Sequence, residues 1–594
     1  MPLSPAKLCD RSVVIHMTGV QCTQPTQVFQ SATAAAMIQG FIDRLRSRES
    51  TMMRLFEGLE TTCEPGEISE AALVLTRTLG LLVDLAPDEL RVKAPDITVL
   101  LSDPDALAAL VEMLYDHWRA HERYLIFEGG ADESRDRALE GHLSFIHSND
   151  DLNRLVRDAY QRILYHLRGH WPRVYRQVPS GANMSLLIDK VSWPCPPGPY
   201  QMLKDIKMVR LALMVPPVVL YPFANRRVGK FEQVDNNPLE RVIINPARWH
   251  CLPIRVGQMN MLVYFDRDFL AHAVCLLNLF EIGGHNEARE KPDGILVFGV
   301  PRGALKKNPT VFFEDEENDL VLGVIARSDE VDYLGYFKKM LLTLHNVAAM
   351  RKGRLPVHGA MCRVDLKGGR TSNVVIVGDS GAGKSETLEA FRILADEYLR
   401  GMTIIFDDMG SLKLGDDGSI IAYGTEIGAF VRLDDLDTGY AFGRIDRSIL
   451  VNPHRQNARV VIPITDYVDV VAGHTVDMLL YANNFEGVDD EHPIVDRSPS
   501  PEAALDVFRK GLRTAKGTSD ESGLVGTYFG NPFGPEQLQE RHEPIAARFF
   551  QAAFDAGIPV GQLRTRLGVE GMEREGPIEA AKGLFDLIRG STEG

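Results

Sequence analysis

Residues 378–385 read GDSGAGKS, an arrangement of glycines, a lysine and a serine that can hold phosphate. It fits the pattern G-x-x-x-x-G-K-[ST], in which the glycines let backbone N–H groups turn toward phosphate oxygens. The lysine reaches the terminal phosphates, and the last hydroxyl ligates Mg²⁺. The predicted phosphate-binding residues are Gly378, Asp379, Ser380, Gly381, Ala382, Gly383, Lys384 and Ser385.

The flanking sequence supports this interpretation. The apolar run NVVIV (373–377) predicts a strand before the loop, and ETLEAFRILADEYL (386–399) predicts an amphipathic helix whose N-terminus favours an anion. A second predicted strand, MTIIFDD, ends in Asp407 and Asp408, where carboxylates that hold a metal are expected. A glycine-rich turn with a surface lysine is the alternative, but the context favours nucleotide or polyphosphate binding.

Two further candidates precede the loop. Lys338 and Lys339 lie in YLGYFKKM, and His358 lies in LPVHGAMC just before the predicted P-loop strand. Taken alone, such a histidine is more often structural than a ligand, and a lysine pair usually faces solvent. Only the wider pattern makes them candidates for chemistry.

That pattern resembles the phosphoenolpyruvate carboxykinases over about residues 333–534. Lys339 precedes His358 by nineteen residues, and His358 precedes Ser380 by twenty-two, which fits the ATP-dependent family. The segments that resemble family motifs are YLGYFKK, TEIGAFVR, QNARVVIPI, GHTVDMLLYANNFEGV and TYFGNPFGP. The loop itself, GDSGAGKSE, is more similar to that of the HPr kinase/phosphorylases, as is the HG that precedes the strand.

The resemblance implies a role for each matching residue. Lys339, His358 and Asp407 would hold Mn²⁺ beside the reacting oxygen, and Asp408 belongs to the same metal set. Lys384 and Ser385 would serve the nucleotide phosphates and their Mg²⁺. Ser380, Tyr333 and Arg459 would contact the organic acid or the transferring phosphoryl group, and Glu426 would support the phosphate and metal region. Lys339, His358, Ser380 and Arg459 form the implied catalytic set.

Two departures from the family bear on the substrates. Arg302, in GVPRGALKKNP, is the candidate for the arginine that grips a substrate carboxylate, although only about thirty residues separate it from Tyr333; an ordinary surface arginine is the alternative. The segment 517–530 is shorter than in carboxykinases and lacks the arginine that helps to hold adenine there. The phosphate donor therefore stays open among ATP, another nucleotide and pyrophosphate.

The expected reaction is conversion of oxaloacetate to phosphoenolpyruvate and CO₂ by metal-dependent phosphoryl transfer, with ATP as the favoured donor. An HPr-kinase-like kinase of a protein or another small molecule is one alternative. A nucleotide-binding regulatory protein is the other.

Composition limits the partners and the compartment. The chain has 594 residues, 45% of them apolar, and a net charge of −16, which argues against a nucleic-acid or anionic-lipid surface. Its seven cysteines form no CxxC pair, which is typical of reduced thiols, and no apolar run is long enough to span a bilayer. We therefore expect a cytoplasmic protein that binds a nucleotide and a small organic acid.

The patterning predicts an α/β protein with three parts, and the resemblance implies that its P-loop core is carboxykinase-like, with mixed sheets. Residues 1–190 form a helix-rich region, in which PDALAALVEMLYDHW (104–118) has a helical apolar face. The proline-rich stretch 191–201 is the expected linker. Residues 202–330 form a strand-rich lobe, and 331–594 form the catalytic domain, where Ser500 and Pro501 are expected to start a helix.

Overall fold

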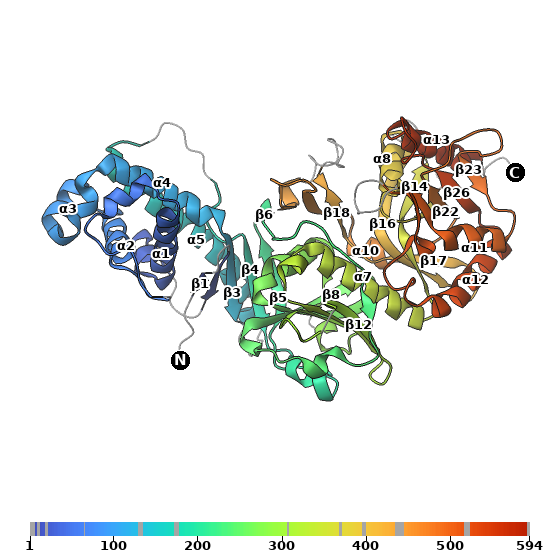
Figure 1. Cartoon of the computed structure of the whole chain (residues 1–594), viewed down its shortest axis with the longest axis horizontal. Coiled ribbons are helices and arrows are strands. Elements are labelled where there is room, and N and C mark those ends of the chain that lie inside the picture. The colour runs from blue at the N-terminus through green and yellow to red at the C-terminus, as the bar shows by residue number, and fades with distance from the viewer. Residues whose placement is uncertain are drawn as a thin grey trace. The chain divides into compact units, whose positions relative to one another are not determined.

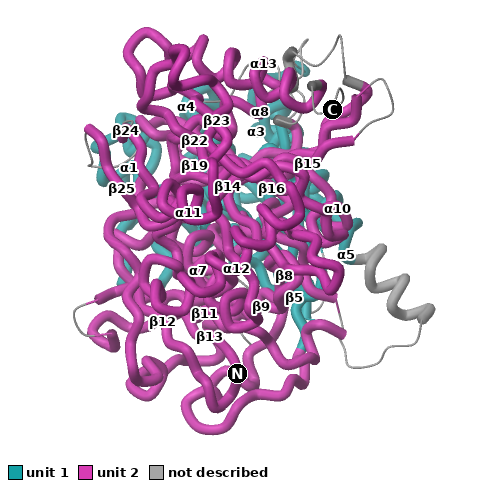
Figure 2. Tube along the Cα trace, turned by 90° about the vertical axis from the view of Figure 1, so that its right-hand side faces the viewer, with its two compact units in different colours: residues 1–189, 209–218 teal, residues 190–208, 219–594 magenta. Residues whose placement is uncertain are grey.

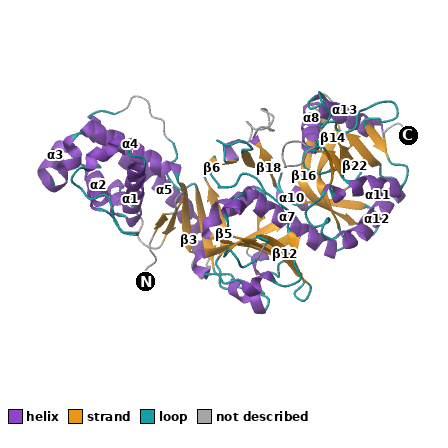
Figure 3. Cartoon of the chain, in the orientation of Figure 1, coloured by secondary structure: helices purple, strands orange, loops and turns teal. Residues whose placement is uncertain are grey.

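The computed structural model describes residues 6–8, 12–17, 22–64, 66–128, 135–171, 178–284, 286–305, 308–366, 371–394, 399–433, 445–515 and 523–590. The chain forms two compact units, residues 1–189 with 209–218 and residues 190–208 with 219–594 (Figure 2). Both units combine helices with sheets (Figure 3), which confirms the predicted α/β class. Among the described residues, no helix has the length and apolar content needed to cross a membrane.

Unit 1 contains a sheet that the helical expectation for residues 1–190 left out. Its strands follow the order β1 (Ala6–Leu8), β2 (Ser12–Met17), β3 (Glu122–Glu128), β4 (Met184–Asp189) and β5 (Met208–Met214). The pairs β2–β3 and β3–β4 are parallel, and β1 runs antiparallel to β2. The sheet and its helices lie in the blue to teal part of the chain in Figure 1.

The helices of unit 1 pack around one apolar core. They are the 3-10 helix η1 (Pro25–Gln30), α1 (Ala32–Ser47), α2 (Glu70–Leu82), α3 (Pro87–Lys93), α4 (Pro104–Ala120) and α5 (Arg135–Arg168), with the 3-10 helices η2 (Thr51–Phe56) and η3 (Pro95–Ser102). In α4 the Asp103 side chain accepts a hydrogen bond from the N–H of Ala106, and Pro104 fills the first turn. Leu107, Leu110 and Val111 of the predicted face join the core that α1, α2 and α5 share.

Unit 2 begins with a strand-rich part. Its sheet order is β8 (Trp249–Val256), β9 (Met259–Asp266), β11 (Gly294–Val300), β13 (Leu320–Ala326), β12 (Thr310–Asp315) and β7 (Glu232–Gln233), and β10 (Glu281–Ile282) pairs with β8. In the proline-rich stretch 191–201, Trp193 and Tyr200 are buried in the core beneath this sheet. These two aromatic side chains flank the four prolines and hold the stretch against the core.

The second part of unit 2 is built on an eight-stranded mixed sheet. Its order is β21 (His474–Thr475), β17 (Ile420–Gly424), β16 (Leu399–Leu414), β14 (Leu355–Leu366), β15 (Thr371–Val377), β22 (Met478–Asn483), β26 (Val560–Arg564) and β23 (Val495–Arg497). β15, β22 and β26 are parallel, whereas β14 runs antiparallel to both β15 and β16. The predicted strand before the loop is thus β15, and the predicted strand that ends in two aspartates lies within β16.

Helices and short sheets complete unit 2. The helices are α6 (Leu270–Cys275), α7 (Leu334–Arg351), α8 (Lys384–Leu394), α10 (Tyr467–Val471), α11 (Pro501–Lys510), α12 (Gln539–Asp555) and α13 (Glu575–Gly590). A four-stranded sheet has the order β18 (Gly428–Arg432), β20 (Arg459–Pro463), β19 (Ile449–Val451) and β6 (Val218–Leu220), and β24 (Leu512–Thr514) pairs with β25 (Leu524–Gly526). The Ser500 side chain caps α11 by accepting from the N–H of Ala503, which confirms the predicted start.

Candidate functional site

The loop between β15 and α8 has the backbone shape that its glycines permit. Gly381 has φ +78° and Gly383 has φ +90°, a region that other residues rarely adopt. A Cβ on Gly383 would also lie 2.6 Å from the Thr565 hydroxyl oxygen, so this position excludes any side chain. The sequence prediction of a tight glycine loop between strand and helix is confirmed.

The peptide groups of the loop are held in one orientation from outside. Asn484 donates to the carbonyl of Gly381 at 2.9 Å, and the Thr565 hydroxyl donates to that of Ala382 at 2.7 Å. In the described part of the chain, no hydrogen bond is donated by the N–H groups of Gly381 or Gly383. Because hydrogen bonds to the Gly381 and Ala382 carbonyls fix the peptide groups, the N–H groups of Gly381 and Gly383 are available to bind an anion at the start of α8.

Lys384 folds back across this loop. Its ammonium donates to the carbonyls of Gly378 and Asp379, both at 2.8 Å, and the residue is buried. Burial lowers the pKa of Lys384, although the Asp379, Asp408 and Asp407 carboxylates oppose this effect. These two carbonyl oxygens accept the hydrogen bonds of the Lys384 ammonium that phosphate oxygens would accept when a phosphate binds.

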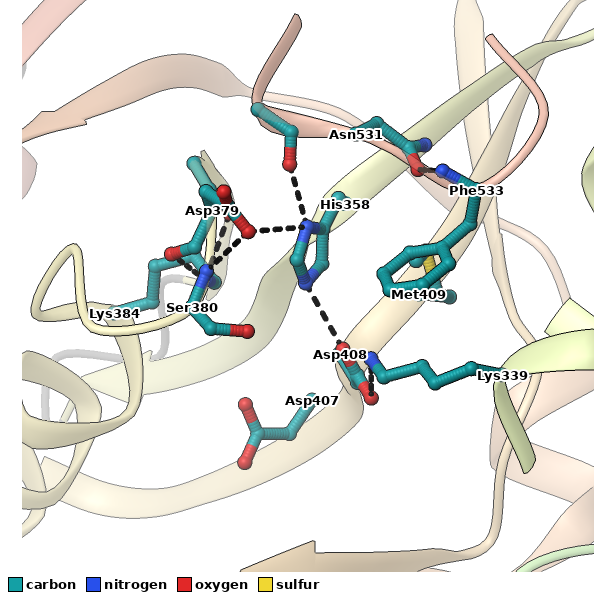
Figure 4. Close-up of polar contacts among 12 residues, drawn as sticks. Lys339, His358, Asp379, Ser380, Lys384, Asp407, Asp408, Met409, Asn531 and Phe533 are labelled. Atoms are coloured by element: carbon teal, nitrogen blue, oxygen red, sulfur yellow. Dashed lines mark hydrogen bonds and ion pairs between the residues drawn. The ribbon is translucent and has the colours of Figure 1, made fainter. Parts of the chain in front are cut away.

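Asp407 and Asp408 are neighbours on β16, and Figure 4 shows that His358 and Lys339 contact Asp408 but not Asp407. Asp407 accepts a hydrogen bond from the Ser385 hydroxyl at 2.9 Å. Burial raises the pKa of Asp407, and the hydrogen bond from Ser385 partly offsets this rise. The pair brings two hard oxygen donors together at the first turn of α8, the donor type that Mg²⁺ prefers.

Asp408 lies against the two lysines of α7 and His358 of β14. Lys339 Nζ contacts both Asp408 carboxylate oxygens at 2.8 and 2.7 Å, Lys338 Nζ contacts Oδ2 at 2.7 Å, and His358 Nε2 lies 3.0 Å from Oδ1. Burial alone would raise the pKa of Asp408, but the cationic neighbours outweigh it and hold the pKa well below its usual range. Asp408 therefore stays an anion.

The backbone of Asp408 has φ +132°, which is unfavourable for a residue with a side chain. The opposite position on β14 is Gly359, where a Cβ would lie only 2.5 Å from the carbonyl oxygen of Ile376. The glycine of the HG motif thus allows the close approach of β15 to β14. The resemblance implied that Asp407 joins Lys339 and His358, but in the structure Asp408 makes those contacts, because successive side chains on a strand point to opposite faces.

Lys338 connects Asp408 to Glu426, which follows β17. Lys338 Nζ lies 3.0 Å from Glu426 Oε1, and both side chains are almost fully buried. Burial lowers the pKa of Lys338, but Asp408 and Glu426 outweigh this effect and raise it. Burial raises the pKa of Glu426 to about 8, and Lys338 limits the rise. Unlike a typical lysine pair, Lys338 does not face solvent, because Asp408 and Glu426 contact its ammonium in the interior.

His358 also connects this cluster to the loop. Its Nδ1 lies 2.5 Å from the Gly530 carbonyl oxygen and 3.6 Å from Asp379 Oδ1. Asp379 accepts hydrogen bonds from Arg513 Nε and the Thr527 hydroxyl, both at 3.0 Å. Burial lowers the pKa of His358, and its hydrogen bond to Asp408 partly offsets the effect. The loop aspartate therefore ties the P-loop to the segment around β24 and β25.

Tyr333 and Arg459 lie together beside this cluster. Tyr333 precedes α7 and is buried; burial raises its pKa, while the charge of Arg459 and a hydrogen bond from it oppose the rise. Arg459 Cζ lies 5.5 Å from the centre of the Phe430 ring. Lys338 also acts electrostatically on Tyr333, so the pair belongs to the same region of unit 2.

The remaining predicted residues differ in their surroundings. Ser380 is exposed at the tip of the loop, and its N–H donates to Asp379 Oδ1 at 2.7 Å. Arg302 lies elsewhere, with a side chain that is 68% exposed and whose Nε donates to the Arg327 carbonyl. None of the hydrogen bonds and ion pairs of Arg302 among the described residues involves a member of the cluster. Residues 517–522 of the shortened segment lie outside the described residues.

Arg227 was not among the site residues predicted from the sequence. Arg227 Cζ lies 5.2 Å from the centre of the Phe533 ring, and Lys339 Nζ lies 4.6 Å from the same ring. Burial lowers the pKa of Arg227, while Tyr336, Asp379 and Tyr333 oppose the effect. Arg227 thus approaches both the loop and Tyr333. No local motif signals it, since it comes from a short segment more than a hundred residues before Tyr333.

Comparisons with known proteins assign no family. No protein-family model matches the chain, and a search among curated proteins found no match. Within the described part of the chain, no group of three or more His, Cys, Asp or Glu side chains has the arrangement of a metal site. The site must therefore be interpreted from its own geometry.

Proposed function

We propose that the protein is a metal-dependent phosphotransferase of the carboxykinase type, which converts oxaloacetate to phosphoenolpyruvate and CO₂ with ATP as the favoured donor. One observation carries the proposal. A glycine loop with Lys384 and the Ser385–Asp407 pair is joined by His358 to a charged cluster of Lys338, Lys339 and Asp408. Simple nucleotide binding would not require these buried lysines. The proposal includes a carboxykinase-like core around the mixed sheet.

The donor phosphates would occupy the loop. Its inward N–H groups and Lys384 would contact the terminal phosphates once the lysine leaves the carbonyls of Gly378 and Asp379. The lysine charge would then stabilise the negative charge on the oxygens of the transferring phosphoryl group. The exposed Ser380 lies at the open side of the loop, where the acceptor would approach.

The donor set fits two divalent cations. Ser385 and Asp407 offer hard oxygen donors suited to Mg²⁺ beside the nucleotide phosphates. His358, Asp408 and Lys339 offer two nitrogens and a carboxylate within contact of one another, a mixed set that suits Mn²⁺. Burial lowers the pKa of Lys339, which favours the neutral amine that a metal ligand needs. When bound, the cations would stabilise negative charge on the reacting oxygens.

Arginines surround the expected acceptor position. Arg459 beside Tyr333, and Arg227 beside Phe533, would bind the carboxylates of oxaloacetate. Breaking the bond to the departing carboxylate releases CO₂ and leaves an enolate. The enolate oxygen then attacks the γ-phosphorus, the bond to the bridging oxygen breaks, and ADP leaves. The cationic side chains of the protein would stabilise the negative charge of the enolate until that transfer.

A kinase of a protein or another small molecule is the second candidate, in the manner of the HPr kinases. Asp379 favours it, because the loop resembles the GDSG of those kinases and this aspartate lies 3.6 Å from His358. In such a reaction His358 and Asp379 would orient an attacking hydroxyl instead of an enolate. Both candidates use the same donor side of the site.

One assay separates the two. Purified protein with Mg²⁺ and Mn²⁺ receives oxaloacetate together with ATP, GTP or pyrophosphate, and phosphoenolpyruvate is measured by a coupled assay. The proposal predicts phosphoenolpyruvate formation with at least one donor and a loss of at least a hundredfold in Lys339→Ala. Absence of product with every donor, together with intact ATP binding, would exclude the carboxykinase reaction and favour the kinase alternative.

A further inference from the structure

Unit 1 contains a cavity of about 510 Å³ that the site in unit 2 does not explain. Its walls come from β2, η1, α1, α2, α4, β3 and the described part of α5. Pockets of roughly 300–1,000 Å³ typically hold small-molecule ligands in proteins. The cavity is thus large enough for a ligand of several rings, and every residue that lines it belongs to unit 1.

The walls are mostly apolar and are not fully covered by the fold. Met17, Phe29, Leu114, Leu152 and Val156 all line the cavity and all stay partly exposed. Core packing normally leaves few voids larger than a water molecule, because unfilled apolar space forfeits dispersion contacts. Apolar side chains that stay open around such a volume therefore indicate a binding site for an apolar molecule.

An aromatic wall has its polar ends satisfied away from the cavity. Tyr115 and Tyr160 stack with ring centres 3.9 Å apart, and the Tyr160 hydroxyl donates to Glu112. The Trp118 indole N–H donates to the Ser180 carbonyl at 2.7 Å. Neither acceptor belongs to the lining. The tyrosine and tryptophan thus offer ring surface to a ligand, and a flat ring is the shape that such surface accepts best.

The charge of the lining decides which ligands can enter. The described residues that line the cavity include no lysine or arginine; His16 is their one histidine, and their one carboxylate, Asp151, pairs with Arg154 at 3.2 Å. Two polar lining residues already accept hydrogen bonds, since Gln27 accepts from the N–H of Thr23 and Ser31 accepts from that of Ala34. An ionised ligand would lose its water without gaining an opposite charge, which is costly.

We propose that this cavity binds an uncharged, mostly apolar aromatic small molecule, separately from the phosphoryl-transfer site. The volume, the open apolar walls, the aromatic surface and the lack of a lysine or arginine among the described lining residues all support this class. A nucleotide or an organic acid is not expected as the ligand, because these residues offer no lysine or arginine to neutralise its negative charge.

Two dyes that share one skeleton test the proposal on the full chain. N-phenyl-1-naphthylamine is uncharged, and 8-anilino-1-naphthalenesulfonate adds one sulfonate to the same rings. Fluorescence titration should show saturable binding of the uncharged dye at one site per chain, at least tenfold tighter than that of the sulfonate. No saturable binding of the uncharged dye, or equal or tighter binding of the sulfonate, would overturn the proposal.

Two matched variants test whether the dye binds in the cavity. Ala34 lines the cavity from α1, whereas Ala36 lies two residues further on the same helix, is also partly exposed, and does not line it. Ala34→Phe should weaken binding of the uncharged dye at least tenfold, and Ala36→Phe should change it less than twofold. Equal affinities in the two variants would overturn the assignment.

Three further measurements test whether misfolding accounts for this difference and whether the dye binds in the cavity. Circular dichroism should show that Ala34→Phe unfolds at the same temperature as Ala36→Phe. Val156→Phe, which fills the cavity from α5, should weaken dye binding to a similar extent. Hydrogen exchange with the dye bound should slow in residues 27–38 and 148–160 and in no part of unit 2, and slowing confined to unit 2 would contradict the site.

Discussion

Asp408 is the carboxylate on which the charges of the site depend. Lys338, Lys339 and His358 all contact it, and its backbone adopts an unfavourable φ to reach them. Strain of this kind costs of order 1–3 kcal/mol and persists where the surrounding contacts hold it in place. The same carboxylate is thus both a structural counter-ion and, in the proposed function, a metal ligand.

Asp408→Asn should therefore lower the free energy of unfolding by about 3 kcal/mol, because it leaves buried lysine charges without their main partner. Asp407→Asn should lower it by less than about 1 kcal/mol, since an asparagine oxygen still accepts from Ser385. Urea denaturation of the two variants measures the difference. Equal losses would show that Asp408 does not balance the lysines.

Activity should fall in both aspartate variants, but for different reasons. Asp407→Asn should weaken binding of the Mg²⁺ that accompanies the nucleotide, so that half-maximal activity needs more Mg²⁺. Asp408→Asn should abolish turnover at nearly unchanged ATP affinity. Lys413→Ala, an exposed lysine on the same strand, is the control and should keep full activity. Steady-state kinetics with varied Mg²⁺ and ATP distinguish these outcomes.

At the scale of elements, the β15–loop–α8 unit depends on two glycines with different surroundings. A Cβ on Gly381 meets nothing within 4 Å, whereas on Gly383 it would collide with Thr565. Gly381→Ala should cost about 1–2 kcal/mol from its positive φ alone, and Gly383→Ala should cost more and weaken ATP binding at least tenfold. Titration with a fluorescent ATP analogue measures this, and equal effects would contradict the loop geometry.

A buried histidine of helix α7 should make the free energy of unfolding depend on pH. His345 is buried, and burial lowers its pKa to about 4 from an unfolded value near 6.5. Between these values the unfolded chain binds a proton that the folded chain does not, so the free energy of unfolding should fall as pH drops from 6.5 toward 4. His345→Gln should flatten this slope, while the exposed control His492→Gln should leave it unchanged in denaturation experiments at several pH values.

The local elements of the site were predictable because their signals are short-range. The strand before the loop, the helix after it and the cap at Ser500 follow from residues adjacent in sequence. The choice between Asp407 and Asp408 was not predictable from the spacing, since it depends on which face of β16 meets α7. The partner of Lys338 was not predictable for a similar reason, because only tertiary packing brings Glu426 to it.

At the scale of the whole molecule, the sequence did not predict which strands pair when they lie far apart along the chain. The strands of unit 1 were missed because SVVIHM and ERYLIFE are separated by more than a hundred residues and pair only in the folded sheet. Residues 209–218 belong to unit 1 although the chain on both sides belongs to unit 2. The predicted division into three parts at residues 190, 202 and 331 stays a prediction.

Because every contact of the site lies in unit 2, a fragment of residues 190–594 should bind ATP within about threefold of the full chain. A fragment of residues 219–594 lacks Trp193 and Tyr200 of the core, and losing one large aromatic side chain typically costs about 3–5 kcal/mol. It should unfold at lower urea or fail to fold. Equal stability of the two fragments would show that residues 190–208 contribute nothing to the core.

The most direct measurement of the central claim is ³¹P NMR of one reaction that contains ATP, Mg²⁺, Mn²⁺ and oxaloacetate. The wild-type chain should convert the γ-phosphate resonance of ATP into that of phosphoenolpyruvate. Lys384→Ala should lose both ATP binding and product, and His358→Ala should lose product while it still binds ATP. Phosphoenolpyruvate formed at the wild-type rate by His358→Ala, or a wild-type chain that binds ATP but transfers its phosphate to no acceptor, would contradict the account.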